Sequence, residues 1–321
     1  MEVAVGLDVG GTKILALALD VSSGRSVATR QFPTPQEPSA LRGALADAVE
    51  AALGETEGEG SAVAIGVGVP GFLGLDGIAR QAPNLPGAVG VDLRVMLAER
   101  FGVPVVVDND ANCTAWAARL VDAPDVESLV AVTLGTGIGA GLVIAGELIH
   151  GAHGFAGEPG HMIVDVGGWE CRCGQHGCWE MYASGNGLGR LAQAAVDQQR
   201  GGSLSAAAGS GSVDGALVGR LASEGVAEAL AVLDEYAGWV AVGLANLVNL
   251  LDPAVVVLGG GVVGIGEPLR SRVEAALEAF PTIATGREVV VRLSSLGPAA
   301  GALGAAQLAW KSVSGGGWER R

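Results

Sequence analysis

A histidine and three cysteines lie close together near the middle of the sequence. They form the pattern H-x9-C-x-C-x4-C, made by His161, Cys171, Cys173 and Cys178. Three thiolates and one imidazole can fill all four positions of a closed tetrahedral zinc site and leave no place for water. We therefore expect a structural zinc ion, with unmetallated thiols or a nucleic-acid-binding zinc knuckle as alternatives. The other histidines are expected to be solvated loop residues: His150, His153 and His176.

Two polar turns place glycine beside threonine, and a third glycine run follows a buried strand. The turns are Gly10-Gly11-Thr12-Lys13 and Gly135-Thr136-Gly137-Ile138-Gly139, and the run is Gly259-Gly260-Gly261. Glycine lets backbone N–H groups approach an anion closely, and Thr12 and Lys13 add a hydroxyl and a positive charge. The second turn also fits a dinucleotide fingerprint, but a strand follows it where that fingerprint requires a helix. We predict that these segments hold phosphates, with ordinary hairpin turns as the alternative.

Carboxylates and an amide accompany these motifs in a chain that is poor in charge. Asn109 and Asp110 follow a buried apolar run, and α/β proteins place ligand-binding groups at such strand ends. Because carboxylates and amides hydrogen-bond pairs of hydroxyls, the set suits a polyhydroxylated ligand. Asp110 is the best placed general base. Glu158 and Glu180 flank the cysteines and belong to the same set, whereas Asp108 and Glu170 are expected to be solvated loop residues or helix caps.

The elements that must position these residues occur in a repeated order. Each half begins with two apolar runs joined by a glycine-threonine turn, which predicts a β-hairpin in each half. The fold class is therefore α/β, with two related domains facing each other across a cleft. We expect strands at 3–9, 14–19, 62–69, 103–107, 129–134 and 140–144; helices at 40–53, 91–101, 112–120 and 298–306; a core helix followed by a buried strand within 237–258; and flexible segments at 200–215 and 312–321.

Composition limits the classes of partner. The chain has 321 residues with 49% hydrophobic content, which allows a large core and two domains. Its net charge is −15, from 19 basic and 34 acidic residues, and it has no basic run, so nucleic acid and anionic membranes are disfavoured. The start of the sequence has no cationic region before an apolar stretch, and the cysteines do not form a disulfide framework. We expect a cytoplasmic protein.

The motifs extend over nearly the whole chain, and together they resemble the ROK family of sugar kinases and repressors, in particular its bacterial ATP-dependent glucokinases. The resemblance implies the actin-like ATPase fold of two ribonuclease-H-like domains. We expect a small domain at 1–115 completed by the C-terminal helix at about 298–312, a large domain at 116–297 carrying the zinc site, and a tail at 313–321. The segments that carry the resemblance are 8–13, 109–112, 134–139, 157–161, 171–180 and 258–261.

The resemblance also implies a role for each residue. Asp110 would take the proton from the sugar 6-hydroxyl, and Mg²⁺ would bridge the ATP phosphates near Asp8. His161 would serve both zinc and sugar, so that zinc orders the sugar site. The sugar would be bound by Gly71, Asn84, Asn109, Asp110, Glu158, His161 and Glu180. ATP would be contacted by Asp8, Gly10, Gly11, Thr12, Lys13, Gly135, Thr136, Gly137, Gly259 and Gly260.

Other functions within the family remain open. A sugar-responsive repressor would need an N-terminal helix-turn-helix, whereas the first strand here begins at Val3. The alternative of this kind is therefore a sugar-responsive regulator that lacks a DNA-binding domain. Polyphosphate-dependent glucokinases resemble the chain but have serine and an insertion in the first turn. Kinases for N-acetylmannosamine, fructose or allose are also possible, and the loop from Pro70 to Pro86 should influence the choice of sugar. The family implies a homodimer or homotetramer.

Overall fold

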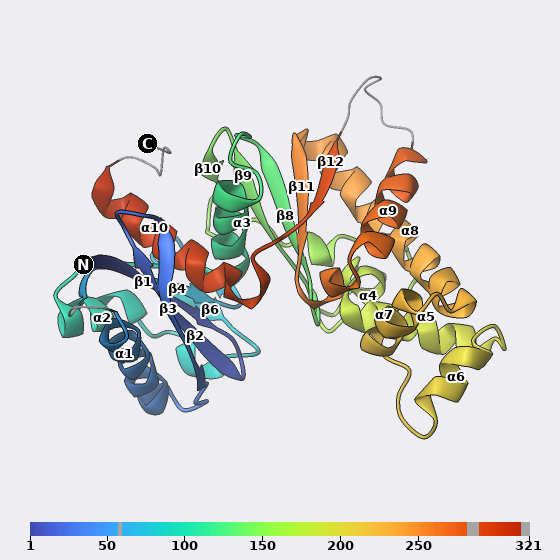
Figure 1. Ribbon diagram of the computed structural model, residues 1–321, viewed down its shortest axis with the longest axis horizontal. Helices are drawn as coiled ribbons and strands as arrows, with labels where there is room; N and C mark the ends of the chain where they lie inside the picture. The colour runs from blue at the N-terminus through green and yellow to red at the C-terminus, as the bar shows by residue number, and fades with distance from the viewer. Residues whose placement is uncertain (57–59, 281–288, 316–321) are drawn as a thin grey trace.

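The computed structural model describes residues 1–56, 60–280 and 289–315, which form two halves, each built on a five-stranded sheet (Figure 1). The first sheet has the strand order β3-β2-β1-β4-β7. Its hairpin pairs Val9 with Ile14, so the predicted turn lies between β1 and β2, and β1, β4 and β7 run parallel. These strands are β1 (Glu2–Val9), β2 (Lys13–Asp20), β3 (Arg25–Pro33), β4 (Ser61–Val69) and β7 (Val105–Asn109).

The second sheet repeats this arrangement, with the strand order β10-β9-β8-β11-β12. Leu134 pairs with Ile138 across the second predicted turn, and β8, β11 and β12 run parallel. The expected duplication of an α/β unit is therefore confirmed. The strands are β8 (Leu129–Leu134), β9 (Ile138–Ile144), β10 (Glu147–Leu148), β11 (Val255–Gly259) and β12 (Val290–Leu293), and a separate two-stranded sheet consists of β5 (Phe72–Leu73) and β6 (Ala79–Gln81).

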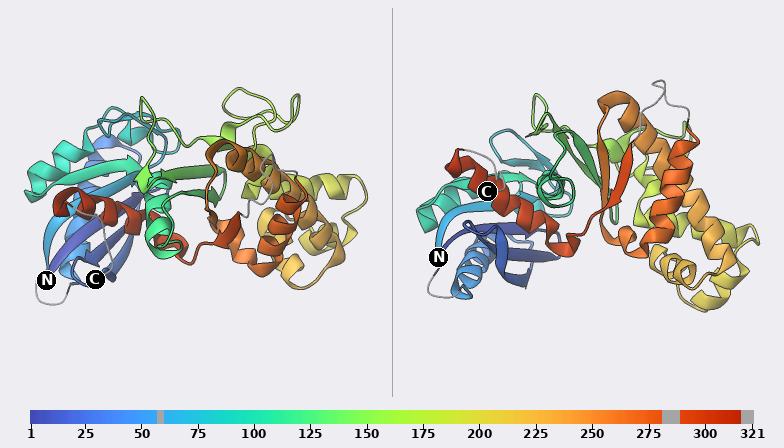
Figure 2. Two further views of the ribbon diagram at one scale, coloured as in Figure 1. Left: turned by 90° about the horizontal axis from the view of Figure 1, so that it is seen from above. Right: turned by 45° about the horizontal axis from the view of Figure 1, so that its top comes forward.

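Helices cover the outer ends of the molecule and fill the space between the sheets (Figures 1 and 2). In the first half lie α1 (Pro38–Gly54) and α2 (Leu93–Phe101), and between the halves lie α3 (Asp110–Val121) and α10 (Ala300–Ser314). The second half carries α4 (Glu180–Ala183), α5 (Gly185–Asp197), α6 (Gly202–Ala208), α7 (Gly215–Ser223), α8 (Ala227–Leu251) and α9 (Glu267–Glu278).

Two expectations about flexible segments were wrong. Residues 202–208 form α6 within the predicted loop, because Leu204 is fully buried in the core of the second half and anchors the helix. The final helix continues to Ser314, three residues into the segment 312–321 that was expected to be flexible, while residues 316–321 lie outside the described residues.

The helix α8 is long and apolar enough to cross a membrane by length and composition alone. However, 61% of its most apolar window is buried inside the protein, and it packs in the main core of the second half. The strand β11 follows it and is buried along its whole length. The predicted core helix followed by a buried strand is confirmed.

The first sheet is covered on both faces, which explains why β1 is a continuous apolar run. Alternate side chains of a strand point to opposite faces. Val3, Val5 and Leu7 therefore pack in the cluster that contains the α1 residues, whereas Ala4 packs with Ala302 and Ala306 of α10. On this face β1 and β4 carry small residues, and these allow α10 to come close, whereas β2 contributes leucines that pack beside the helix.

Glycines set the distance between α10 and its neighbours. A Cβ on Gly66 of β4 would lie 1.9 Å from the carbonyl oxygen of Ala305, and a Cβ on Gly6 of β1 would lie 1.9 Å from that of Ala302. On the other side of α10, a Cβ on Gly304 would lie 1.7 Å from the carbonyl oxygen of Cys113 in α3. The helix thus packs backbone to backbone against both the sheet and α3.

We expect Gly66→Ala to lower the free energy of unfolding by about 1–3 kcal/mol, because the added methyl group forces α10 away from β4. Gly43→Ala in α1 is the matched control: no atom lies within 4 Å of its added Cβ, and the substitution should stabilise the helix by about 0.5–1 kcal/mol. Urea unfolding of both variants measures the difference. Equal stability of Gly66→Ala and wild type would contradict the close packing.

Candidate active site

A cavity of about 450 Å³ is lined by residues from both halves of the protein. Every residue predicted to bind sugar lines it, although these residues are far apart in sequence. Part of the predicted phosphate-binding set lines it as well. The predicted residues found at this cavity are Asp8, Gly71, Asn84, Asn109, Asp110, Gly135, Thr136, Gly137, Glu158, His161 and Glu180.

The position of Asp110 is fixed by the junction between β7 and α3. Asn109 is the N-cap residue of α3, and its Oδ1 accepts hydrogen bonds from the backbone N–H groups of Ala111 and Asn112, at 2.8 and 3.2 Å. Its Nδ2 donates to the carbonyl oxygen of Gly71 at 3.0 Å. A side-chain amide carries two N–H bonds, so the second one can serve a ligand. The cap aims the first residue of the helix, Asp110, into the cavity.

Burial raises the pKa of Asp110 above its usual value. Burial, together with the negative charge of Asp110, raises the pKa of Asp8 to about 7, against the lowering effect of Lys13. Burial raises the pKa of Glu158 as well, against the opposite effect of His161. The cavity therefore holds several carboxyl groups that are more basic than in water. A more basic carboxylate is a better proton acceptor from a hydroxyl group.

The predicted metal ligands come together beside this cavity. One ligand atom from each of His161, Cys171, Cys173 and Cys178 lies within 4.8 Å of all the others. A tetrahedral zinc ion with Zn–S bonds of ~2.3 Å separates its sulfur ligands by about 3.8 Å, so the donor set fits such an ion. His161 turns Nδ1 toward the cluster, 3.8 Å from the Cys171 sulfur, while the same residue lines the cavity. This orientation suits a histidine that serves both metal and ligand.

Glu180 joins the metal cluster to the second glycine-threonine turn. The Cys171 thiol donates a hydrogen bond of 3.2 Å to Oε1 of Glu180. A Cβ on Gly137 would lie only 2.7 Å from Oε2 of the same carboxylate. A larger residue at 137 would displace the end of the Glu180 side chain.

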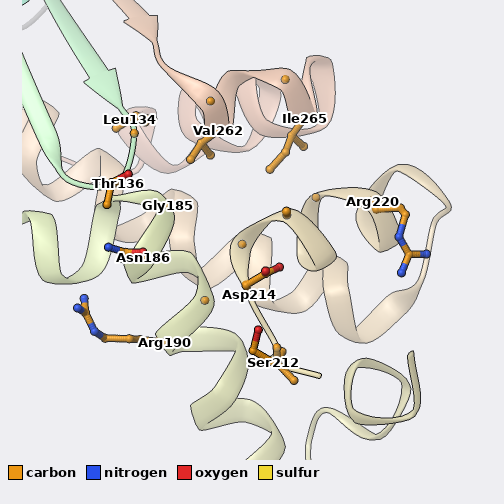
Figure 3. A pocket seen from close by; sticks show the side chains of 18 of the residues that line it. Leu134, Thr136, Gly185, Asn186, Arg190, Ser212, Asp214, Arg220, Val262 and Ile265 are labelled. Atoms are coloured by element: carbon orange, nitrogen blue, oxygen red, sulfur yellow. The ribbon is translucent and has the colours of Figure 1, made fainter. Parts of the chain in front are cut away.

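A second, larger cavity of about 1020 Å³ lies in the second half of the protein (Figure 3). It shares Gly135 and Thr136 with the smaller cavity, so the two meet at the second turn. Val262 and Ile265, which follow β11, point into it from one side in Figure 3. Polar side chains come from α5, α7 and the segment before α7: Asn186, Arg190, Gln193, Ser212, Asp214, Arg220 and Ser223.

Some predicted phosphate-binding residues do not line either of these two cavities. Among the described residues that line them, none comes from residues 10–13, and the run after β11 contributes Gly261 rather than Gly259 or Gly260. The first turn nevertheless lies next to the smaller cavity, because a Cβ on Gly11 would be 2.5 Å from the carbonyl oxygen of Asn84. Roles in phosphate binding stay predictions for these residues.

Two residues that sequence reasoning set aside are part of the site's framework. His150 was expected to be solvated, and Asp108 to be a solvated loop residue or a helix cap. Their side chains are 38% and 12% exposed, and Nε2 of His150 is 2.7 Å from Oδ2 of Asp108. Glu170, His153 and His176 are exposed as expected.

The polar residues of the larger cavity were not identified from the sequence. The spacing of Asn186 and Arg190 could have indicated that both side chains lie on one face of a helix. Nothing in the sequence marks Arg220.

Two sheets of the same strand order, with a cavity lined from both halves, define an actin-like ATPase fold. The profile of the ROK family matches residues 4–312, and the chain belongs to this family. It is 35% identical to a glucokinase of Streptomyces coelicolor over 320 residues, covering 96% of this chain and 98% of that protein. It is 34% identical to an N-acetyl-D-glucosamine kinase of Shigella boydii over 272 residues, covering 80% and 83%.

A solved structure of a ROK family glucokinase from Streptomyces griseus, in complex with glucose and AMPPNP, superposes with a TM-score of 0.81. It is 34% identical, and the match covers 96% of this chain and 99% of that one. The expected family and fold are confirmed.

The buried carboxyl of Asp110 has a consequence for stability. Its pKa in the folded state lies above the usual 3.8, so the folded protein holds this proton more tightly than the unfolded chain does. The contribution of the Asp110 carboxyl to the free energy of unfolding is present at low pH. It is lost as the pH rises from about 4 through the pKa of the folded state. We expect Asp110→Asn, measured without Mg²⁺, to be more stable than wild type at pH 7 but not at pH 4.

Urea unfolding at a series of pH values measures this difference. Asp47→Asn, at an exposed position in α1, is the control and should follow wild type throughout. A lower stability of Asp110→Asn at pH 7 would contradict the effect of burial.

Proposed function

We propose that this protein transfers the terminal phosphoryl group of ATP to the 6-hydroxyl of glucose. The enzyme class is a sugar kinase of the hexokinase type. The observation that carries the proposal is the placement of Asp110 in a cavity lined from both halves, which meets a larger cavity at Gly135 and Thr136. A sugar in the smaller cavity and a nucleotide in the larger one would bring their reacting groups together at this turn.

Asp110 acts as the general base in this proposal. Its raised pKa suits the removal of a proton from the sugar hydroxyl as that oxygen attacks the phosphorus atom. The remaining N–H of Asn109, with Gly71 and Asn84, would orient the sugar from the first half, and Glu158, His161 and Glu180 would do so from the second. Phosphoryl transfer depends mainly on such positioning and on charge stabilisation.

The backbone N–H of Gly137 and the hydroxyl of Thr136 would face the transferred phosphoryl group, whereas the N–H of Gly135 donates to the carbonyl oxygen of Gly137 at 3.0 Å and shapes the turn. Thr12, Lys13 and the glycines at 10 and 11 would contact the phosphates from the first half. Gly259 and Gly260 would do so from the second half, where Gly259 pairs with Thr133 next to the same turn. Mg²⁺, when bound with ATP, would neutralise phosphate charge near Asp8. Zinc would be structural, held by His161 and the three cysteines, and would fix the ring of His161 toward the sugar.

A second candidate is the phosphorylation of another hexose or an N-acetylhexosamine. The 34% identity to an N-acetyl-D-glucosamine kinase favours this alternative. Phe72, which lines the smaller cavity beside Gly71, would then influence which sugar substituents fit. We also infer a cytoplasmic homodimer or homotetramer, in keeping with the family resemblance and the acidic composition.

A panel assay tests the substrate, with ATP consumption followed for glucose, N-acetylmannosamine, N-acetylglucosamine, fructose and allose. We expect the highest kcat/KM with glucose. Asp110→Asn should lower kcat by about 10²–10⁴-fold and leave glucose binding largely intact, because the amide keeps the shape but cannot accept the proton. Asp47→Asn is the control for removal of a carboxylate. Near-normal turnover by Asp110→Asn would exclude it as the base.

Metal analysis of the purified protein tests the zinc site. We expect about one zinc ion per chain, because four protein ligands close the coordination shell. Cys173→Ser should lower the zinc content and the Tm, whereas the matched variant Cys113→Ala should keep the zinc, since Cys113 lies in α3 outside the cluster. A fully stable wild-type protein without metal would contradict a structural role.

A further inference from the structure

The segment 149–157, which joins β10 to the turn at Pro159–His161, lies against the first half of the protein. Nε2 of His150 is 2.7 Å from Oδ2 of Asp108, at the end of β7. Phe155 packs edge-on against Phe72 of β5, with the ring centroids 5.7 Å apart. The segment therefore connects the two halves at the smaller cavity.

Backbone contact supports the same docking. Gly154 has a φ of +89°, and a Cβ at this position would lie 2.3 Å from the carbonyl oxygen of Leu73. Both the dihedral angle and the close approach require glycine at residue 154. Within the segment, the N–H of Ala156 donates to the carbonyl oxygen of His150 at 3.0 Å. These contacts hold the backbone of His150 in place opposite Asp108.

Asp108 connects His150 to the start of α3 through hydrogen bonds. Its Oδ1 accepts hydrogen bonds from the backbone N–H of Asn109 at 2.7 Å and from Nδ2 of Asn112 at 2.9 Å. Asn112 is almost fully buried. Asp108 thus holds the residues on both sides of Asp110, while its second oxygen is held by His150.

The charge distribution favours the same pairing. Asp8, Asp110, Glu158 and Glu180 line the neighbouring cavity, so an additional carboxylate at 108 would suffer repulsion without a partner. The hydrogen bond to Asp108 raises the pKa of His150, which favours its protonated form. A protonated histidine both donates to Asp108 and offsets its charge.

We propose that His150 is a positioning residue for Asp110. It fixes the carboxylate of Asp108 from the opposite half of the protein, and Asp108 in turn fixes the N-terminus of α3, on which Asp110 lies. The kinetic part of this inference rests on the proposed function of Asp110 as the base. A displacement of about 1 Å in a reacting group can cost about 100-fold in rate, so loss of this contact should act mainly on kcat.

Three single variants test the role: His150→Ala, His150→Gln and His153→Ala. In His150→Gln the side-chain amide can still donate to Asp108, because the Nε2 of glutamine lies near the place of the histidine Nε2. His153 is an exposed histidine of the same segment and is the matched control. We expect His150→Ala to lower kcat with glucose 10- to 100-fold and to change KM less than threefold. His150→Gln should recover activity to within threefold of wild type, and His153→Ala should match wild type.

Amide hydrogen exchange provides a second readout that does not depend on activity. The N–H groups of Ala111 and Asn112 are held by the cap of α3, so they should exchange at least tenfold faster in His150→Ala. Amides of α1 should keep their wild-type rates. His150→Gln should restore slow exchange at residues 111 and 112.

The outcomes separate the two proposals. Unchanged kcat in His150→Ala, or failure of His150→Gln to recover it, would overturn the positioning role. If wild type phosphorylates none of the five sugars, the proposed function fails, and exchange alone decides the positioning role. Faster exchange at residues 111 and 112 in His150→Ala then upholds it, and unchanged exchange overturns it.

Discussion

The arrangement of the site depends on how closely α3 is packed between its neighbours. A Cβ on Gly141 of β9 would lie 2.4 Å from the Cβ of Ala115, and a Cβ on Gly304 of α10 would lie 1.7 Å from the carbonyl oxygen of Cys113. Glycines on both sides thus bring two neighbouring backbones into contact with one helix. Packing at this distance leaves α3 little freedom to slide or rotate. Because α3 begins with Asp110, the same contacts that hold the halves together also hold the carboxylate.

The cavity gathers negative charge that the protein itself neutralises only in part. Burial raises the pKa of both Asp8 and Asp110; the charge of Asp110 raises the pKa of Asp8 further, and Lys13 lowers it. A buried carboxylate is stabilised by hydrogen-bond donors, and a polyhydroxylated ligand supplies many of them. A bound sugar would therefore lower the cost of keeping several ionised carboxylates in one cavity. A cation bound together with the nucleotide would also offset the negative charge of the cavity.

Short motifs in the sequence predicted local features well. The two hairpins follow from apolar runs around glycine-threonine turns, and the four metal-ligand candidates lie within one stretch of chain that folds on itself. The pairing of His150 with Asp108 was missed because 42 residues separate them and only the docking of two halves brings them together. The same reason applies to Arg220, whose place at the larger cavity depends on how α7 packs. For α6, a glycine- and alanine-rich composition suggested flexibility, but one buried leucine decided the structure.

The placement of α10 also constrains the order in which the protein can fold during its synthesis. This helix covers β1 and β4 through Ala302 and Ala306, which are fully buried, yet it follows every strand of that sheet in the sequence. During synthesis, the first sheet emerges from the ribosome long before the helix that shields this face. The face must stay exposed, or be protected by a chaperone, until the second half has been made. The half that is translated first is thus among the last to complete its core.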